Sequence, residues 1–289
     1  MGRASWTEHP RVVSLRERSA PANALVATID NFRTHRTGRH AALVAHYGFL
    51  SIFPLMLVFT TVLGLVLEGH PHLQKEIIDS AFSRLPIVGT QLATDPSALH
   101  GSVWVLLLGL LTALWASLRA FNVLQTSLDD IAEVPMPQRR TLVAIRVRSL
   151  LGIVVVGGGQ VATAFLTSTL GFDSWNPFGR AGLGVAAIAM NATVLAATYR
   201  WLCVAPLSWR QVAPGALIGG FVFSLLQVAG TTVVARAIAH ASPVYGTFAI
   251  LIGLITWLNL HAIVALLGAE LNRVLPATRL EPQPATAAS

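Results

Sequence analysis

Six long runs of apolar residues, separated by shorter polar segments, dominate the pattern along the chain. They cover Ala41–Leu67, Gly101 to about Leu128, about Val143 to Leu170, Ala181 to about Leu202, Pro214 to about Ala239, and Tyr245 to about Leu271. Each run is at least as long as the roughly 20 residues with which an α-helix crosses a bilayer. The pattern therefore predicts six transmembrane helices.

The composition supports a membrane protein and excludes an ordinary soluble domain. Of the 289 residues, 54% are hydrophobic and only 11% are charged, and the mean hydropathy is +0.63. Soluble domains carry about 25% charged residues, so the proportion of charged residues in this chain is less than half the usual one. We expect an all-α, polytopic helical bundle over residues 21–275. Residues 1–20 are expected to form a disordered basic tail and residues 276–289 a second disordered tail.

The distribution of Lys and Arg predicts the orientation of the bundle. The formal net charge is +7, which by itself would also suit a nucleic-acid partner. Most of the basic residues, however, lie before the first run, between the second and third, between the fourth and fifth, and after the sixth. Cytoplasmic loops of membrane proteins have this excess. We therefore expect an inner-membrane protein with both termini in the cytoplasm and no nucleic-acid partner.

Two segments outside the six runs also have helical periodicity. The first combines apolar Leu25, Val26, Ile29 and Phe32 with Asp30, Arg33 and Arg36. It predicts an amphipathic helix on the inner leaflet, with its basic side toward anionic lipid. The second lies in the long external loop from about Glu68 to His100, and is either a lid or a helix that rests on the outer surface. The fourth run ends in Tyr199-Arg200-Trp201, which is typical of an interfacial anchor.

Few residues suggest a cofactor or a metal. Cys203 is the single cysteine, so no intramolecular disulfide or cysteine cluster is possible. Gly157-Gly158-Gly159 lies within an apolar run and lacks the following Lys and Ser or Thr of a phosphate-binding loop, so it favours close helix packing. The sequence thus predicts no cofactor, no metal and no catalytic residue.

Polar side chains inside the spans are the candidate site residues, because such groups are costly in hydrocarbon and usually face protein or water. On the second run, Arg119, Asn122, Thr126 and Asp129 follow steps of three, four and three, which places them on one helical stripe. The stripe predicts a cavity that offers a cation to a phosphate or carboxylate head group. The alternative is that Arg119 reaches an interface or pairs with a neighbouring helix. We expect Arg119 and Asn122 to face the protein interior.

Two other spans carry candidates. On the first, Tyr47, Ser51 and Pro54 lie at i, i+4 and i+7, and a proline-broken helix beside two hydroxyls predicts either a midplane binding site or a kink that serves packing. On the last, Glu270 and Arg273 are three apart and are predicted to pair, with a structural role the main alternative to binding.

Histidine and asparagine near the middle of the last span are weaker candidates. Asn259 and His261 are too close in sequence to share a helix face, so they do not form one site. His261 is either a proton carrier or a side chain that is bonded to a neighbouring helix.

Several strings resemble the YihY/BrkB family of bacterial inner-membrane proteins. They are Tyr245-Gly246-Thr247, Trp257 and Leu267-Gly268-Ala269-Glu270-Leu271-Asn272 at the end, Pro206-Leu207-Ser208-Trp209-Arg210-Gln211-Val212-Ala213-Pro214-Gly215-Ala216 before the fifth span, and Tyr47, Ser51 and Pro54 in the first. The resemblance covers about Phe32 to Val274. It implies six helical spans and an inner-membrane location, without a secure activity. Members of the family were once labelled ribonuclease BN, and others are linked to serum resistance and envelope lipid handling.

Three functions remain open on this sequence. A transporter or lipid-handling protein would use a cavity that is basic at one end and suits an amphiphile with an anionic head group, with membrane lipids as partners. A scaffold for other envelope proteins would expose a small-residue face such as Gly215, Gly219 and Gly220. An enzyme of the ribonuclease type is the least favoured, because no His and carboxylate ligands recur at metal-binding spacing. The sequence does not predict the oligomeric state.

Overall fold

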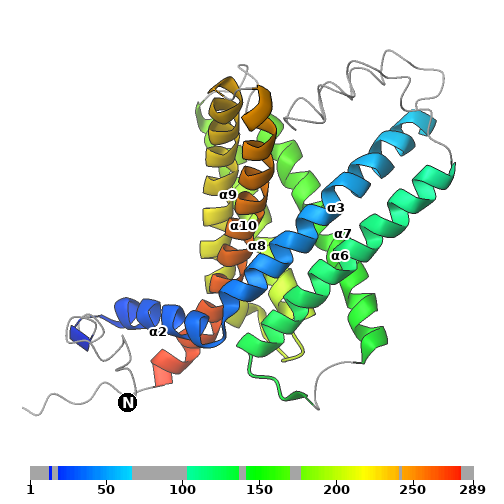
Figure 1. Ribbon diagram of the computed structural model, residues 1–289. Coiled ribbons are helices and arrows are strands. Elements are labelled where there is room, and N and C mark those ends of the chain that lie inside the picture. The colour runs from blue at the N-terminus through cyan, green and yellow to red at the C-terminus, as the bar shows by residue number, and fades with distance from the viewer. Residues whose placement is uncertain are drawn as a thin grey trace, which may run out of the picture. The chain divides into compact units, whose positions relative to one another are not determined.

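The computed structural model describes residues 13–14, 19–66, 103–136, 141–169, 177–240 and 243–280. Within these ranges the chain forms seven long helices and no β-strand (Figure 1). They are α2 (Ala20–Thr34), α3 (Thr37–Val66), α6 (Val103–Ile131), α7 (Leu142–Thr169), α8 (Pro177–Leu202), α9 (Trp209–His240) and α10 (Pro243–Leu280). The prediction of an all-α fold is confirmed for the described part of the chain.

Six of these helices coincide with the six apolar runs, and α2 coincides with the predicted amphipathic segment. Four stretches are long and apolar enough to cross a membrane: Leu107–Ile131, Ala181–Leu202, Trp209–Gly230 and Leu251–Leu275. That the other two helices, α3 and α7, also span a membrane stays a prediction. The external segment from Glu68 to His100 lies outside the described residues.

Local sequence signals explain where the helices begin. Ser19 caps α2, since its side chain accepts a hydrogen bond from the Ala22 amide at 3.4 Å and a proline follows in the first turn. At α9, the Ser208 amide donates to the Gln211 side-chain oxygen at 2.8 Å, and the Gln211 amide donates back to the Ser208 hydroxyl at 3.4 Å. This reciprocal pair is a capping box.

The C-terminal boundary differs from the sequence-based one. Helix α10 continues to Leu280, whereas the predicted tail begins at residue 276. Pro276 does not end the helix at the preceding residue, although proline commonly does so. Residues 281–289 lie outside the described part, so the predicted tail is untested there.

The helices contribute to two compact units. Unit 1 contains Met1–Ala42, Phe121–Leu225 and His261–Ser289, and unit 2 contains Leu43–Ala120 and Leu226–Leu260. The division falls within α3, α6, α9 and α10, so each of these helices contributes one part to each unit. The two sites described below lie entirely in unit 1.

Glycines bring α8, α9 and α10 very close together in unit 1, and we call this contact the glycine interface. A Cβ atom on Gly220 of α9 would meet the Ala192 amide nitrogen of α8 at 2.5 Å, and one on Gly215 would collide with the Gly268 carbonyl oxygen of α10. The Tyr199 hydroxyl of α8 donates to the Ala265 carbonyl oxygen of α10 at 2.6 Å. Small residues allow this backbone approach between membrane helices.

The glycine interface also bears on the scaffold hypothesis. That hypothesis expects the face with Gly215, Gly219 and Gly220 to be exposed. Instead, Gly219 faces the Leu195 side chain, and the other two face Ala192 and Gly268 of the same chain. The small-residue face is therefore already covered within unit 1, and the expected exposed face is not found there.

Candidate functional site

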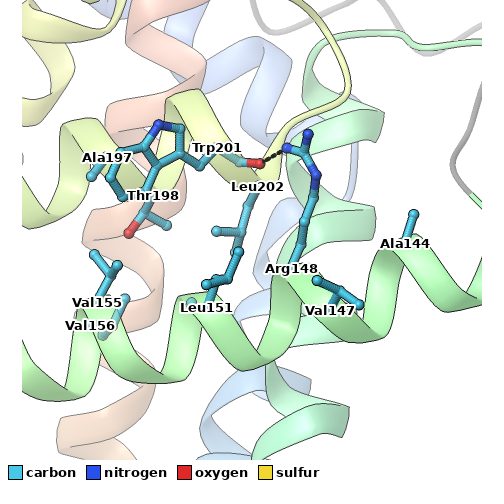
Figure 2. Close-up of a pocket in the computed structure, with 11 residues that line it drawn as sticks. Ala144, Val147, Arg148, Leu151, Val155, Val156, Ala197, Thr198, Trp201 and Leu202 are labelled. Carbon is cyan, nitrogen blue, oxygen red and sulfur yellow. Dashed lines mark hydrogen bonds between the residues drawn. The ribbon is translucent and has the colours of Figure 1, made fainter.

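A groove runs along one side of α7, where it packs against α8 (Figure 2). It encloses about 580 Å³. Its α7 side is formed by Ala144, Val147, Arg148, Leu151, Gly152, Val155 and Val156, and its α8 side by Ala197, Thr198, Trp201 and Leu202. The α7 positions recur at steps of three and four, so they form one helical stripe. The stripe from Ala144 to Val156 extends about 18 Å along the helix at a rise of 1.5 Å per residue.

The charged residue of the lining, Arg148, lies nearer one end of the groove, which we call its polar end. Near the start of α7, the Arg148 guanidinium donates to the Trp201 carbonyl oxygen at the end of α8 (Figure 2). Beyond the other end, α7 approaches α8 closely, since a Cβ on Gly159 would collide with the Val194 side chain. Between these points the lining is almost entirely aliphatic and aromatic. The groove is therefore mostly apolar, with one guanidinium in its lining, about 6 Å along α7 from Ala144.

Aromatic and basic side chains gather around the polar end. The Trp201 and Trp209 rings meet edge to face, with 6.5 Å between their centroids. Arg200 places its guanidinium 5.1 Å from the centre of the Trp209 ring and donates to the Leu207 carbonyl oxygen. Tryptophan and arginine in this combination are typical of the level of the lipid head groups. This contact supports the predicted interfacial anchor at the end of the fourth run.

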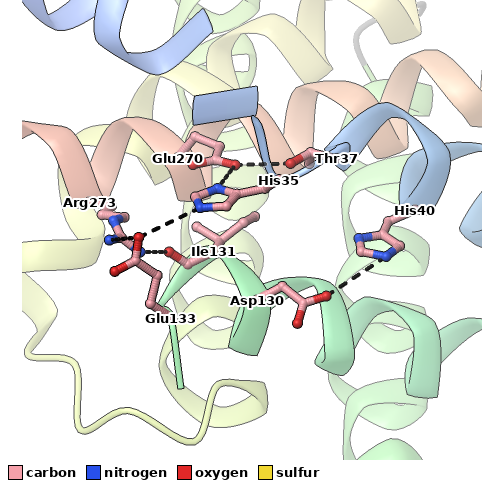
Figure 3. A network of polar contacts seen from close by, with 8 residues as sticks. All are labelled: His35, Thr37, His40, Asp130, Ile131, Glu133, Glu270 and Arg273. Carbon is pink, nitrogen blue, oxygen red and sulfur yellow. Dashed lines mark hydrogen bonds and ion pairs between the residues drawn. The ribbon is translucent and has the colours of Figure 1, made fainter. Parts of the chain in front are cut away.

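A second site, which we call the polar cluster, joins the corner between α2 and α3 to α10 and to the end of α6 (Figure 3). Its centre is Glu270, whose side chain is fully buried. One carboxylate oxygen, Oε1, lies 2.9 Å from His35 Nδ1 and accepts a hydrogen bond from the Thr37 hydroxyl at 2.9 Å. His35 caps the C-terminus of α2, and Thr37 is the first residue of α3. Glu270 is therefore hydrogen-bonded to one residue on each side of the corner between these helices.

Glu133 and Arg273 form the outer part of the polar cluster. Arg273 pairs with Glu133 at 2.5 Å and also donates to the Ile131 carbonyl oxygen. The Arg273 guanidinium, through this hydrogen bond and its charge, lowers the pKa of the Glu133 carboxyl from its ordinary value. Glu133 Oε1 lies 3.8 Å from His35 Nε2, on the side of the ring away from Glu270. A separate pair at the same end, His40 and Asp130, is also 3.8 Å apart.

The predicted pairing of Glu270 with Arg273 is replaced by other partners. Glu270 is hydrogen-bonded to His35 and accepts from Thr37, while Arg273 pairs with Glu133. These partners come from elements more than a hundred residues away in sequence, so local helical spacing could not reveal them. Arg148 and His35 were missed as site residues for different reasons. Arg148 lies inside an apolar run, which is a usable signal, whereas no local pattern singles out His35.

The residues of the predicted stripe on α6 differ in their exposure and do not form one buried face. Arg119 is exposed, with its guanidinium 5.8 Å from the centre of the Trp115 ring, so the prediction that it faces the protein interior is wrong. Asn122 is half-buried, and Thr126 is exposed and donates to the Asn122 carbonyl oxygen at 3.0 Å. A hydroxyl bonded to its own helix needs no further partner, and a guanidinium over an indole gains a cation–π contact. None of the three residues lines the α7–α8 groove.

The candidates on the first span all lie on α3. The Ser51 hydroxyl is buried and donates to the Gly48 carbonyl oxygen at 2.7 Å. The Tyr47 ring packs edge to face on Trp115 of α6, with 6.3 Å between centroids. Helix α3 continues through Pro54 to Val66. A binding role for Tyr47, Ser51 and Pro54 stays a prediction.

His261 has an aromatic neighbour on another helix. The His261 ring meets Phe223 of α9 edge to face, with 4.8 Å between centroids. In the described part of the chain, no three His, Cys, Asp or Glu side chains gather closely enough to hold a metal ion.

Long helices, four of them apolar enough to cross a bilayer, define a helical membrane protein. The chain belongs to the virulence factor BrkB family, whose model matches residues 28–289. The family resemblance of the sequence motifs is thereby confirmed.

Two curated relatives are named as membrane proteins. A UPF0761 membrane protein from Alcanivorax borkumensis is 25% identical over 260 residues, which cover 86% of this chain and 59% of the relative. A UPF0761 membrane protein from Azoarcus sp. is 33% identical over 135 residues, which cover 44% of this chain and 31% of the relative. This chain thus spans less than two thirds of the length of either relative. No solved structure matches it.

Proposed function

We propose that this membrane protein binds an amphiphile with an anionic head group and handles it as a lipid-binding protein or transporter. The α7–α8 groove receives the acyl chain, and Arg148 receives the phosphate or carboxylate. The observation that supports this most directly is an apolar groove of about 580 Å³ with one guanidinium in its lining. Ligand sites of 300–1,000 Å³ with apolar walls and few polar groups are typical of small-molecule binding.

The dimensions of the groove suit one leaflet of a bilayer. From Arg148 to Val156 the α7 stripe is about 12 Å long, which fits within the roughly 15 Å of one half of the hydrocarbon core. Arg148 donates to the carbonyl oxygen of Trp201, which lies beside Trp209 and Arg200, a combination that favours the head-group level. The loop before α7 carries Arg139 and Arg140, which favour the cytoplasmic side. The groove would then hold an inner-leaflet lipid of the inner membrane, with both protein termini in the cytoplasm.

Helix α2 supports the same location. Leu25 and Ile29 are exposed, whereas Ala24 and Thr28 are buried. An exposed apolar face beside Arg33 and Arg36 suits a helix in the membrane interface. The scaffold hypothesis is less favoured, because the glycine face that it would use is covered by α8 and α10.

Binding of labelled phosphatidylglycerol and phosphatidylcholine to the purified protein tests the proposal. Arg148→Gln should lower the affinity for phosphatidylglycerol about tenfold, equivalent to ~1.4 kcal/mol, and leave phosphatidylcholine nearly unchanged. Leu151→Trp should weaken both, because a larger side chain fills the groove. Arg146→Gln is the matched control, since Arg146 is exposed two residues earlier on α7 and is not part of the lining.

The variants also separate the alternatives. Equal losses in Arg148→Gln and Arg146→Gln would mean that any surface cation attracts the lipid, and the groove assignment would be wrong. Unchanged binding in Leu151→Trp would equally contradict it. Transfer of the lipid between leaflets of reconstituted vesicles then distinguishes a transporter from a protein that only binds lipid.

A further inference from the structure

The Glu270 carboxylate is unusual in where it lies and in how it is satisfied. It is completely inaccessible to solvent, within the apolar stretch Leu251–Leu275. Both of its hydrogen bonds, from His35 and Thr37, go to Oε1. In the part of the chain that the structure describes, the buried Oε2 has no hydrogen-bond partner. Buried polar atoms are nearly always bonded, so this one calls for an explanation.

Charge makes the burial of Glu270 costly. An ionised carboxylate that leaves water needs a compensating charge and a donor for each oxygen, and otherwise it takes up a proton. A neutral acid would avoid that cost but would need access to a source of protons. His35 is the only ionisable side chain bonded directly to Glu270 in the described residues. An imidazole is suited to this task because its two nitrogens can accept and release a proton on opposite sides.

The imidazole of His35 is placed between a buried and an exposed carboxylate (Figure 3). Nδ1 lies 2.9 Å from Glu270 Oε1, and Nε2 lies 3.8 Å from Glu133 Oε1. The Glu133 side chain is 64% exposed and is paired with Arg273. A separation of 3.8 Å is longer than a hydrogen bond, so His35 and Glu133 are close neighbours without a direct hydrogen bond. The three groups therefore lie in a row that leads from an exposed carboxylate to a buried one.

We infer that Glu270 and His35 form a proton-binding site that is loaded from the exposed side of the polar cluster, past Glu133. In the unloaded state Glu270 is ionised and His35 is neutral, with its proton on Nδ1. A proton from water binds Nε2, and the Nδ1 proton moves to Glu270 Oε1. His35 ends neutral with its proton on Nε2, and Glu270 ends as a neutral acid. The site has gained one proton, and the contact at 2.9 Å is kept with its donor and acceptor exchanged.

The other titratable groups around this stretch of α10 are few. From α10 itself and the end of α6, Arg273 and Glu133 neutralise one another. From α8, the Tyr199 hydroxyl donates to the Ala265 carbonyl oxygen. Helix α9 faces α10 here with Gly215, which has no side chain. The pair of His40 and Asp130, from α3 and α6, lies at the same end of the unit (Figure 3). His35 is thus the route by which a proton reaches Glu270.

Infrared difference spectroscopy of the purified, full-length protein tests this inference. The wild type should show the carbonyl-stretch band of a neutral carboxylic acid that appears on acidification, and Glu270→Gln should lose it. Deuterium exchange of that acid should become slower in Glu133→Gln. In His35→Gln the acid should not exchange at all on the time scale of exchange in the wild type, although the glutamine amide can still donate a hydrogen bond to Oε1. Asp130→Asn is the matched control and should leave the band and its exchange unchanged.

Two outcomes would overturn the inference. One is the absence of any Glu270-dependent acid band over the whole pH range in which the protein stays folded. The other is an acid band whose exchange is the same in wild type, His35→Gln and Glu133→Gln, because the proton would then reach Glu270 by another route.

Since loss of Glu270 can also unfold the protein, a second measurement uses the wild type. Nitrogen NMR of ¹⁵N-histidine-labelled protein should show the His35 tautomer changing from Nδ1–H to Nε2–H on acidification, and a constant tautomer would contradict the inference. Neither experiment measures lipid binding, so this inference can fail while the proposed lipid binding holds, and the reverse.

Discussion

The two sides of α8 are packed in opposite ways. Toward α9 and α10, backbone meets backbone, since Gly220 lies against Ala192 and Gly215 against Gly268. Toward α7, a groove of about 580 Å³ lies along part of the contact and is lined by side chains such as Leu151 and Trp201, although Gly159 of α7 also meets Val194 of α8 closely. Both sides have similarly apolar sequences, so hydrophobicity does not decide the difference.

This difference has a physical basis that is specific to membranes. Lipid tails are as apolar as leucine, so apolar burial gives little drive for two helices to associate. Close helix contact comes from small residues and from interhelical hydrogen bonds, such as that of the Gly215 amide to the Asn272 side-chain oxygen at 2.6 Å. Where such contacts are confined to part of a helix pair, the rest can remain open to a lipid chain. The glycine interface therefore accounts for stability, and the groove is the part of the molecule for which we propose binding.

A substitution in the glycine interface should have the largest effect. Gly215→Val places its side chain against the Gly268 carbonyl oxygen and the Asn272 amide group, neither of which can move away easily. We expect a loss of about 3 kcal/mol or more in the free energy of unfolding, measured by titration with a denaturing detergent. Gly157→Ala on α7 is the control, because nothing lies within 4 Å of its Cβ position. Equal losses in the two variants would mean that the interface is not closed by its glycines.

The hydrogen bond across the glycine interface should have a smaller effect. Asn272→Leu keeps the approximate size of the side chain but removes the acceptor of the Gly215 amide. The expected loss is about 1 to 2 kcal/mol in the same unfolding measurement. Asn122→Leu provides a comparison, since Asn122 is only half-buried. If Asn122→Leu destabilises the protein as much as Asn272→Leu, the interhelical bond contributes nothing particular.

The smallest effect is expected in the groove. Leu151 is 58% exposed, so Leu151→Ala should change the free energy of unfolding by no more than about 0.5 kcal/mol. Leu266 on α10 is completely buried, and Leu266→Ala should cost about 2 kcal/mol or more. A cost in Leu151→Ala that approaches the cost in Leu266→Ala would show that the groove is part of the core.

The helices could be predicted well from the sequence because the signal is local. An apolar run of more than 20 residues has to satisfy its backbone groups internally, so it forms a helix wherever it lies. Accordingly, the first run, Ala41–Leu67, ends one residue after the end of α3, which covers Thr37–Val66. The capping box at Ser208 and Gln211 is local as well, and it explains where α9 begins.

The sites were much harder to predict, because they depend on which helices meet. Glu270 was correctly selected as a polar residue in a span, but its partner His35 is 235 residues away. Arg119 and Arg148 are both arginines within an apolar run, so the sequence does not distinguish them. The Arg148 guanidinium donates to the Trp201 carbonyl oxygen of a neighbouring helix, whereas the Arg119 guanidinium lies over the Trp115 ring. The cavity predicted from Arg119 stays a prediction, and the groove described above lies on α7 and α8. Helical spacing gives the face of a residue, and only packing gives its partner.

Photocrosslinking tests most directly whether the groove is a lipid site. A phosphatidylglycerol with a photoreactive group in its acyl chain is added to the reconstituted protein, and the labelled peptides are mapped by mass spectrometry. We predict that labelling concentrates on residues 144–156 and 197–202, falls in Arg148→Gln and is unchanged in Arg146→Gln. Equally strong labelling of the exposed α9 residues Leu217, Ile218 and Phe221 would show that lipid covers the helices without preference and would contradict the account.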